Sequence, residues 1–278
     1  MNQSSTGYVN SVSLNWGSAA LGDRPVPGDY DGDGFMDLAV WRPGSGTWYV
    51  LTSGVTSGTF YSVSMSRTWG SQSLGDVPVP ADYDGDGRTD MAVWRPGNGV
   101  WYILTSTSKF NASVSVPWGR GANGDMPVPA DYDGDLRADP AVWRSGAGTW
   151  FVLQSSTNYS THTAHNWGKA SLGDQPVQGD YDGDGQADLA VWRPSSGTWY
   201  VLASTTGYTG SSSFDWGAAA HGDRPVPGDY DADGLIDFAV WRSGSGVWYV
   251  VMSSTGNASY FSVAWGSGAL GDVPITIR

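Results

Sequence analysis

Short apolar segments alternate with glycine-rich and polar segments along the whole chain. In the stretch 75–106, two apolar runs at 91–95 and 101–105 flank a Pro-Gly-Asn-Gly turn. Runs of this length, rich in Val, Trp and Tyr and bounded by turn residues, are typical of β-strands. A proline-containing segment at 78–83 suits an edge strand or a strand start, and a polar segment at 113–118 ends in Trp-Gly. The pattern predicts four strands in each such unit.

The same unit occurs five times. Its Asp-Tyr-Asp motif recurs at spacings of 53, 49, 49 and 49 residues, beginning at Asp29, Asp82, Asp131, Asp180 and Asp229. Repeated four-stranded units of about 50 residues are typical of β-propeller blades, although an open stack of repeats would bury the same faces. We therefore predict a single all-β repeat domain over 1–278, a β-propeller of about five four-stranded blades. The alternatives are an open β-repeat array or a fragment of a larger propeller.

Each unit contains two tryptophans separated by six residues, at Trp41/Trp48, Trp94/Trp101, Trp143/Trp150, Trp192/Trp199 and Trp241/Trp248. A two-residue hairpin turn at 97–98 would pair Pro96 with Gly99 and place the two tryptophans of the unit directly opposite each other. The arginine after the first tryptophan, Arg95 in this unit, would then point to the opposite face. There it is expected to stack on an aromatic ring or hold an aspartate.

The two ends of the chain carry extra copies of parts of the unit. Trp-Gly occurs six times, and each copy is followed five residues after its glycine by a Gly-Asp pair, whereas the Asp-Tyr-Asp loop occurs five times. We therefore expect residues 8–16 and 261–278 to contribute closure strands or inter-subunit strands. Strand addition to a neighbouring copy would give a homo-oligomer.

The loop after Asp-Tyr-Asp has a metal-binding pattern, Asp-x-Asp-x-Asp-Gly-x-x-Asp. Calcium prefers six to eight oxygen ligands in flexible geometry, and this loop offers four carboxylates and a backbone carbonyl at its seventh position. The loops occupy 29–37, 82–90, 131–139, 180–188 and 229–237. The predicted carboxylate ligands are Asp29, Asp31, Asp33, Asp37, Asp82, Asp84, Asp86, Asp90, Asp131, Asp133, Asp135, Asp139, Asp180, Asp182, Asp184, Asp188, Asp229, Asp231, Asp233 and Asp237. The predicted carbonyl ligands are Phe35, Arg88, Arg137, Gln186 and Leu235.

These loops predict up to five calcium ions, with unequal sites. An EF-hand would need Glu at the twelfth loop position, which Val93 occupies in the second unit. The third loop has Leu136 where the others have glycine, and a side chain at positive φ costs about 1 kcal/mol. We therefore predict that the third site binds most weakly, whereas Ala232 at the fourth position of the last loop should matter less.

The charge of the chain follows the same loops. All 27 acidic residues are aspartates, of which twenty lie in the five loops, and the net charge is −13. Five divalent cations would reduce this charge to −3. The acidic surface argues against nucleic acid binding, because phosphates would be repelled.

The block D-Y-D-G-D-G-x-x-D-x-A-V-W-R-P resembles the FG-GAP/VCBS repeat family over residues 22–265. Integrin α-subunit propellers carry similar calcium loops, as do many bacterial secreted and surface proteins. The resemblance implies a propeller with calcium at the blade edges and an extracellular or cell-surface location. The first seven residues lack the apolar stretch of a signal peptide, so we expect a signal that has been removed.

Candidate catalytic groups are few, and we expect no enzyme activity. The chain has no cysteine, and its three histidines include His162 and His165 in a polar connection, where we expect a solvated loop and no metal pair. Almost all aspartates belong to repeated motifs, whereas an enzyme site usually breaks such symmetry. We predict that the first tryptophan of each pair and the Trp-Gly tryptophans are core residues. The second tryptophans are the candidates for partial exposure and ligand binding: Trp48, Trp101, Trp150, Trp199 and Trp248.

Taken together, the residues predict an extracellular, calcium-stabilised binding module without catalytic activity. Glycans or surface proteins are the expected partners, as for a lectin or adhesin, because repeated weak pockets can act through avidity. The alternative is a structural protein that forms oligomers or filaments through its surplus terminal strand. Neither membrane insertion nor nucleic acid binding is expected, since no apolar run approaches the ~20 residues of a membrane helix.

Overall fold

The computed structural model describes residues 13–54 and 61–275. These residues belong to two compact units. One contains Asn15–Arg144 with Phe151–Ala164, and the other contains the described parts of Met1–Leu14, Ser145–Trp150 and His165–Arg278. Each unit is described by itself below.

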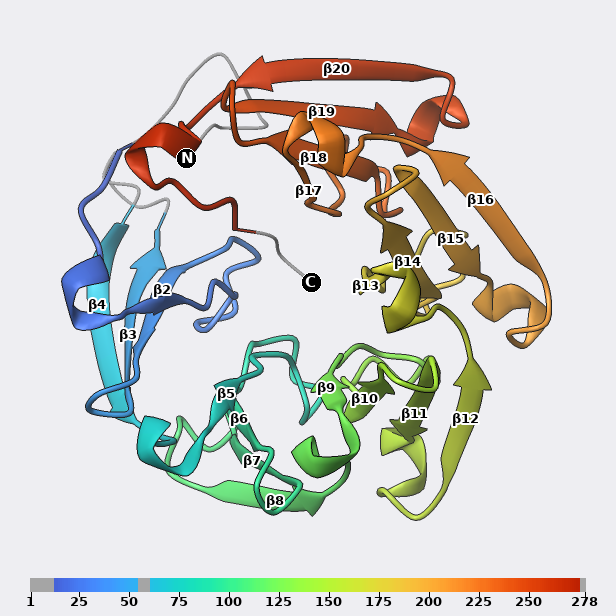
Figure 1. Ribbon diagram of the computed structural model, residues 1–278. Helices are drawn as coiled ribbons and strands as arrows, with labels where there is room; N and C mark the ends of the chain where they lie inside the picture. The colour runs from blue at the N-terminus through green and yellow to red at the C-terminus, as the bar shows by residue number, and fades with distance from the viewer. Residues whose placement is uncertain (1–12, 55–60, 276–278) are drawn as a thin grey trace. The chain divides into compact units, whose positions relative to one another are not determined.

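The described chain forms five antiparallel sheets of four strands (Figure 1). The first sheet contains β1 (Arg24–Pro25), β2 (Leu38–Arg42), β3 (Thr47–Ser53) and β4 (Tyr61–Thr68). The second contains β5 (Val77–Pro78), β6 (Met91–Arg95), β7 (Val100–Leu104) and β8 (Ser113–Pro117). The third contains β9 (Asp125–Pro127), β10 (Ala141–Arg144), β11 (Thr149–Leu153) and β12 (His162–Asn166). The fourth contains β13 (Gln175–Pro176), β14 (Leu189–Arg193), β15 (Thr198–Leu202) and β16 (Ser211–Asp215). The fifth contains β17 (Asp223–Pro225), β18 (Phe238–Arg242), β19 (Val247–Met252) and β20 (Ser259–Ala264).

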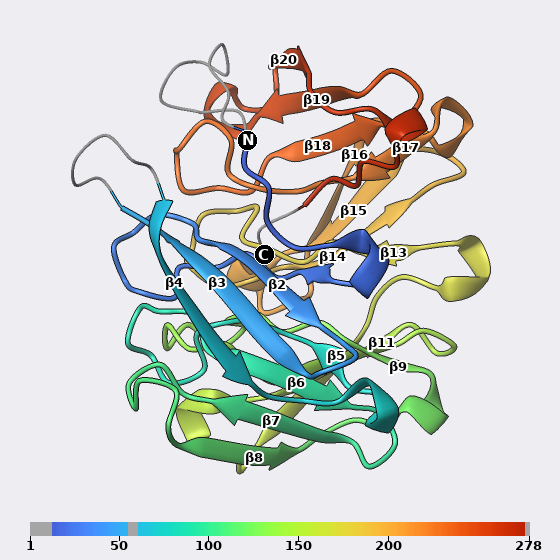
Figure 2. The same cartoon turned by 90° about the vertical axis from the view of Figure 1, so that its left-hand side faces the viewer.

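Within every sheet the strands follow each other in sequence order, as in a propeller blade. Figure 2 shows this arrangement for β2, β3 and β4, and again for β6, β7 and β8. The fold class predicted from the sequence, an all-β protein of five four-stranded propeller blades, is confirmed. Among residues 13–54 and 61–275 the helices are all short 3₁₀ turns, and none is long and apolar enough to cross a membrane.

The 3₁₀ turns recur at two places in the repeat. One follows each Trp-Gly pair: η2 (Ala19–Leu21), η3 (Gln72–Leu74), η4 (Gly121–Asn123), η6 (Ala170–Leu172), η8 (Ala219–His221) and η10 (Gly268–Leu270). The other lies before the fourth strand of the last three sheets: η5 (Ser155–Thr157), η7 (Ser204–Thr206) and η9 (Ser253–Thr255). The terminal segments 13–16 and 265–275 contain no strand, and residues 8–12 and 276–278 lie outside the described residues.

The central hairpin has the predicted register but not the predicted turn. Trp94 lies opposite Trp101, and Arg95 lies opposite Val100. The turn spans four residues rather than two, because the Gly99 N–H donates to the Arg95 carbonyl at 2.8 Å. Gly99 has φ +70°, and a Cβ there would lie 1.9 Å from the Gly119 carbonyl oxygen. Glycine is therefore required both by the backbone angle and by the close approach of the next segment.

The tryptophans of each repeat form a hydrogen-bonded network. The indoles of Trp94 and Trp101 both donate to the Trp118 carbonyl at 3.1 Å. The Trp118 indole in turn donates to the Phe151 carbonyl on the next sheet at 3.1 Å. The same indole-to-carbonyl bond to the following sheet is made by Trp16, Trp69, Trp167 and Trp216. These five Trp-Gly tryptophans therefore connect to the following repeat through their side chains.

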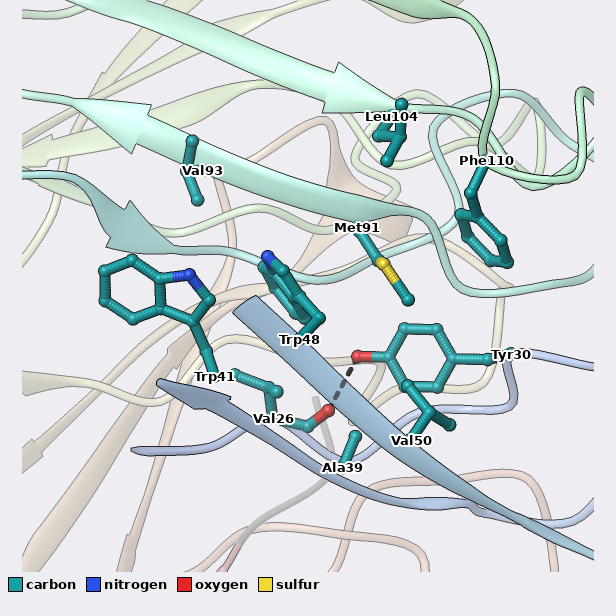
Figure 3. Packing of buried hydrophobic residues seen from close by; sticks show 10 residues of the cluster. All are labelled: Val26, Tyr30, Ala39, Trp41, Trp48, Val50, Met91, Val93, Leu104 and Phe110. Carbon is teal, nitrogen blue, oxygen red and sulfur yellow. Dashed lines mark hydrogen bonds between the residues drawn. The ribbon is translucent and has the colours of Figure 1, made fainter. Parts of the chain in front are cut away.

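The space between the first and second sheets is filled by large side chains (Figure 3). Trp41 and Trp48 are fully buried there, and Met91 and Val93 of β6 pack against them. Tyr30 closes the cluster and donates its hydroxyl to the Val26 carbonyl at 2.6 Å. Burying side chains of this size is the main stabilising contribution, roughly 25 cal/mol per Å² of apolar surface.

The arginine after the first tryptophan has the structural role that the sequence predicts. Arg95 forms a two-pronged ion pair with Asp76, at 2.7 and 2.9 Å, and its guanidinium lies 4.5 Å from the centre of the Tyr102 ring. The Asp76 side chain has no exposed surface. Four other repeats contain the same arrangement, in the pairs Arg42–Asp23, Arg144–Asp125, Arg193–Asp174 and Arg242–Asp223. The recurring Gly-Asp motif therefore supplies the arginine partner.

Candidate metal centres

The five aspartate loops lie between the first and second strands of the sheets, each closed by one β-bridge, as between Ala81 and Asp90. The first aspartate of the loop organises the backbone. The Asp82 carboxylate accepts from the Gly85 N–H at 2.7 Å and from the Gly87 N–H at 2.8 Å. These bonds curl the loop around its first carboxylate, so that the following aspartates converge.

The aspartate at the ninth loop position has the most buried carboxylate of the loop. Asp90 has no exposed surface, and it accepts from the backbone N–H groups of Tyr83 and Ser106 at 2.9 and 2.6 Å. The Ser106 hydroxyl also donates to Asp86 at 2.9 Å. One carboxylate thus joins the loop to the end of the third strand.

Sequence reasoning missed the serine that supports these carboxylates. It recurs after the third strand of every repeat, as Ser53, Ser106, Ser155, Ser204 and Ser253, and each hydroxyl donates to the fifth-position aspartate. In four repeats the next residue bonds the third-position aspartate, through Thr107, Ser156, Thr205 and Ser254. The signal was present in the sequence, because serine occupies the same place in all five repeats.

Five groups of three aspartates bring carboxylate oxygens within 4.8 Å of one another. The groups are Asp29/Asp31/Asp33, Asp82/Asp84/Asp86, Asp131/Asp133/Asp139, Asp180/Asp182/Asp188 and Asp229/Asp231/Asp237. In three of them one oxygen of the third-position aspartate is buried and has no hydrogen-bond donor: Oδ1 of Asp84, Asp133 and Asp231. A buried carboxylate oxygen without a donor is costly unless a cation binds it. Each group could therefore hold a metal ion.

Burial changes the acidity of the ninth-position aspartates. Desolvation raises the pKa of Asp139 to about 7 and that of Asp90 to about 6, although hydrogen bonds from the backbone and from serine oppose the shift. Desolvation likewise raises the pKa of Asp37 and Asp188 to about 6. In the metal-free chain these carboxylates are thus poorly solvated anions, which a bound cation would stabilise.

Comparison with known proteins supports this repeat architecture. A family model described as an FG-GAP-like repeat matches residues 29–93, 82–142 and 180–240, which is more than half of the chain. The chain belongs to the FG-GAP-like repeat family. No match was found among curated protein sequences.

The chain is also similar to two solved structures. The chain is similar to an Agrocybe aegerita lectin described for specific recognition of non-reducing terminal N-acetylglucosamine, with 15% identity and a TM-score of 0.55. That similarity covers 82% of this chain and 76% of the lectin chain. A second similarity, to Hsv2 of Kluyveromyces lactis, has 12% identity and a TM-score of 0.42, and covers 77% of this chain and 64% of that one. At 15% identity the likeness to the lectin shows the fold alone.

Consecutive FG-GAP-like loops are bonded directly to each other within each unit. The Thr89 N–H of the second loop donates to the Asp29 carbonyl of the first at 2.6 Å. The same bond joins Ala138 to Asp82 at 2.6 Å and Ile236 to Asp180 at 2.7 Å. In each case the donor precedes the ninth-position aspartate, and the acceptor belongs to the first-position aspartate of the preceding loop. The candidate sites of each such pair are therefore linked through one backbone hydrogen bond.

The two irregular FG-GAP-like loops keep the same backbone path. Leu136 has φ +69° and Ala232 has φ +62°, so both occupy the left-handed region that glycine prefers. The Leu136 N–H still donates to Asp131, at 2.7 Å. The seventh-position residues donate their N–H groups to the fifth aspartate, as Arg88 does to Asp86 at 2.9 Å. Their role as carbonyl ligands stays a prediction.

The predicted partial exposure of the second tryptophans is wrong for four of the five. Trp48, Trp101, Trp150 and Trp199 are fully buried, and only Trp248 is partly exposed. Their side chains point between sheets and donate to a backbone carbonyl, so their rings are not available for stacking on a ligand. The Trp-Gly tryptophans, predicted as core, are instead half-buried: Trp16, Trp69, Trp118, Trp167, Trp216 and Trp265. The prediction for the first tryptophans is confirmed, since Trp41, Trp94, Trp143, Trp192 and Trp241 are buried.

The two neighbouring histidines also differ from expectation. They lie on strand β12 rather than in a loop. His162 packs against the Trp118 ring with 5.1 Å between ring centres, and His165 packs against Tyr208 at 4.8 Å. Burial lowers the pKa of His165, which favours its neutral form.

Proposed function

We propose that this protein is a calcium-stabilised, non-catalytic binding module that works outside the cell and recognises carbohydrate or another surface ligand. The proposal of calcium binding rests on the five convergent aspartate groups. Three of these groups contain a buried carboxylate oxygen without a hydrogen-bond donor. A hard cation with flexible oxygen coordination fits such a donor set, and calcium is the physiological ion with that preference.

Calcium would be held by the first, third, fifth and ninth aspartates of each loop, with the seventh-position carbonyl as an additional ligand. When bound, the ion supplies positive charge that compensates carboxylates already buried by the fold. Extracellular calcium modules bind in the range of about 10⁻⁴–10⁻³ M, which fits a compartment with millimolar calcium. An affinity of this kind would suit a location outside the cell.

The binding part of the proposal rests on the repeat architecture and on the lectin that shares the fold. A repeated surface presents several equivalent sites, so weak individual contacts can add up through avidity. The half-buried Trp-Gly tryptophans supply aromatic surface in every repeat, and such surface is suited to the apolar face of a sugar ring.

A glycan array probed in millimolar calcium, and again after chelation and restoration of calcium, tests this function. We expect binding to one class of glycan that disappears with chelator and returns with calcium. Circular dichroism of the same samples shows whether the protein is folded at each step. A blank array with folded, calcium-loaded protein would contradict the carbohydrate part of the proposal.

Assembly through a terminal strand is the second candidate function. It is favoured by one observation: all five described sheets have four strands without any contribution from the described residues 13–16. Light scattering of the full chain and of a variant lacking residues 1–12 tests it. Assembly predicts an oligomer that is lost with the deletion, and a monomer in both cases would exclude this function.

A further inference from the structure

A cavity lies at the junction of the second and third repeats. It has a volume of about 260 Å³ and lies in the first compact unit, where Trp118 of the second repeat meets Arg144 and Phe151 of the third. Arg120 and Asn123, at the start and end of the 3₁₀ turn η4, form its polar rim. The cavity is smaller than the roughly 300–1,000 Å³ of sites for drug-sized ligands, so it suits a single ring.

The cavity coincides with a substitution inside the repeat. Phe151 stands where the other repeats have Tyr49, Tyr102, Tyr200 and Tyr249. In the fourth repeat the arginine Nη1 of Arg193 donates to the Tyr200 hydroxyl at 3.3 Å. Phenylalanine has no hydroxyl, so this acceptor is missing in the third repeat.

The Arg144 guanidinium therefore has one nitrogen, Nη1, whose N–H groups are not used in a hydrogen bond within the described chain. Its Nε and Nη2 atoms are held by Asp125 at 2.7 and 3.1 Å, and its guanidinium lies 4.5 Å from the centre of the Phe151 ring. Its Nη1 atom has no acceptor among the described residues, and 32% of its side chain is exposed. The fixed ion pair holds the guanidinium in place, which leaves Nη1 oriented without loss of side-chain entropy on binding.

Two further side chains with hydrogen-bond donors, Arg120 and Asn123, line the cavity. The Arg120 side chain is exposed and has no carboxylate partner within the described chain, and the Asn123 amide lies three residues further on. The only nearby carboxylate, Asp125, has no exposed side-chain surface. Trp118 adds a half-buried aromatic ring that is fixed by its bond to the Phe151 carbonyl at 3.1 Å. A matching ligand must offer acceptors, negative charge and one apolar face.

We propose that this cavity binds one acidic saccharide residue of the uronic acid type. The sugar would pack an apolar face on the Trp118 ring and direct its carboxylate to Arg144 and Arg120. Charge-assisted bonds from guanidinium to carboxylate are stronger than those to neutral hydroxyls, so the acidic sugar is preferred over a neutral one. This inference rests on the proposed carbohydrate-binding function and assigns it a site and a ligand class.

Methyl glucuronide and methyl glucoside, titrated into the calcium-loaded full chain, test the site by saturation-transfer NMR and tryptophan fluorescence. We expect the glucuronide to bind more tightly than the glucoside, and its affinity to fall as salt is raised. Phe151→Tyr should weaken glucuronide binding by about tenfold, because the new hydroxyl occupies Nη1 and fills the cavity. Arg120→Ala should reduce the affinity and the salt dependence together.

The matched control is Tyr200→Phe, which removes the hydroxyl that Arg193 contacts in the fourth repeat. It should leave the affinity of the cavity beside Phe151 unchanged and add a second glucuronide site beside Arg193. Phe151→Tyr introduces the residue found in the other four repeats, so the variant should fold, and its melting temperature checks this. Unaltered glucuronide binding in both Phe151→Tyr and Arg120→Ala would overturn the site while leaving the carbohydrate-binding function standing. Equal affinity for glucoside and glucuronide would overturn the acidic ligand class. Absence of binding to both sugars, together with a blank glycan array, would overturn site and function together.

Discussion

At the scale of single residues, the aspartate loops combine conformational strain with buried charge. Leu136 illustrates the strain. It occupies the left-handed region at φ +69°, where the equivalent residues Gly34, Gly87, Gly185 and Gly234 lie at +80° to +92°. Its side chain is 79% exposed, so no packing compensates for the strained backbone.

Leu136→Gly is therefore expected to stabilise the protein. Relief of the strain should contribute about 1 kcal/mol, and the third loop should bind calcium more tightly. Thermal melts and calcium titrations of the variant measure both effects. Leu172→Gly, at an exposed leucine in a 3₁₀ turn without positive φ, is the control and should destabilise. A lower melting temperature for Leu136→Gly would show that strain does not limit this loop.

The buried charge predicts an unusual pH dependence. Asp139 has a pKa of about 7 in the metal-free fold and an ordinary value of 3.8 when unfolded, so the folded state binds the proton more tightly. Its contribution to stability is fully present below pH 3.8 and is lost as the pH rises through about 7. Asp37, Asp90 and Asp188 act in the same direction, with pKa values of about 6.

Metal-free protein should consequently melt at a higher temperature at pH 5 than at pH 8. Calcium should reverse the order, because ligand carboxylates must lose their protons to bind a cation. Calorimetry at both pH values measures how the melting temperature changes with pH, once with chelator and once with calcium. Stability of the metal-free protein that rises between pH 5 and pH 8 would contradict the assignment.

At the scale of elements, the tryptophan network explains why the repeats are so similar in sequence. Two indole N–H groups donate to the backbone carbonyl of a Trp-Gly tryptophan. The indole of that tryptophan then donates to a backbone carbonyl of the next sheet. Trp69, for example, accepts from Trp41 and Trp48 and donates to the Tyr102 carbonyl at 2.9 Å. Each sheet is thus fixed to its successor by hydrogen bonds as well as by apolar packing.

Trp69→Phe isolates the hydrogen-bonding part of this contact. The variant retains an aromatic ring but leaves the Tyr102 carbonyl without the indole donor, and it should lose about 1–3 kcal/mol of stability. Denaturant unfolding measures the loss. The matched change Trp265→Phe, where the described chain shows no such bond to a following sheet, should cost less. Equal losses would attribute the effect to reduced ring volume alone.

At the scale of the whole molecule, calcium is expected to contribute a large part of the stability. The net charge of −13 is concentrated in loops whose carboxylates lie within 4.8 Å of one another. Each site filled to 100 times its Kd contributes about 2.7 kcal/mol. Backbone bonds between consecutive loops, such as that from Thr89 to Asp29, extend this effect from one repeat to the next.

Chelation should therefore lower the melting temperature sharply, and calcium should restore it. Differential scanning fluorimetry across a calcium series measures the shift, with magnesium as the comparison ion because it favours strict octahedral geometry. Asp90→Asn removes a buried negative charge from one loop and should reduce the calcium-dependent part of the shift by roughly one site in five. A melting temperature that is independent of calcium would exclude a structural role for the ion.

The repeat, the strands, the register of the central hairpin and the aspartates of the loops can all be predicted from the amino-acid sequence alone. These features are local or periodic, because strand patterning and the spacing of Trp94 and Trp101 fix which residues pair. The recurrence of the loop in five copies likewise made its metal-binding pattern specific.

Only the tertiary structure decided which tryptophans are exposed and where a cavity forms. Exposure depends on contacts between different repeats: Trp101 is buried because a neighbouring repeat covers it, whereas Trp118 stays half-buried at the next junction. The support that Ser106 gives to Asp86 and Asp90 joins residues far apart in the chain. The cavity lies beside Phe151, which lacks the hydroxyl of the equivalent tyrosines, and beside the Arg144–Asp125 pair. Strand periodicity cannot encode such contacts, because they depend on how separate sheets pack.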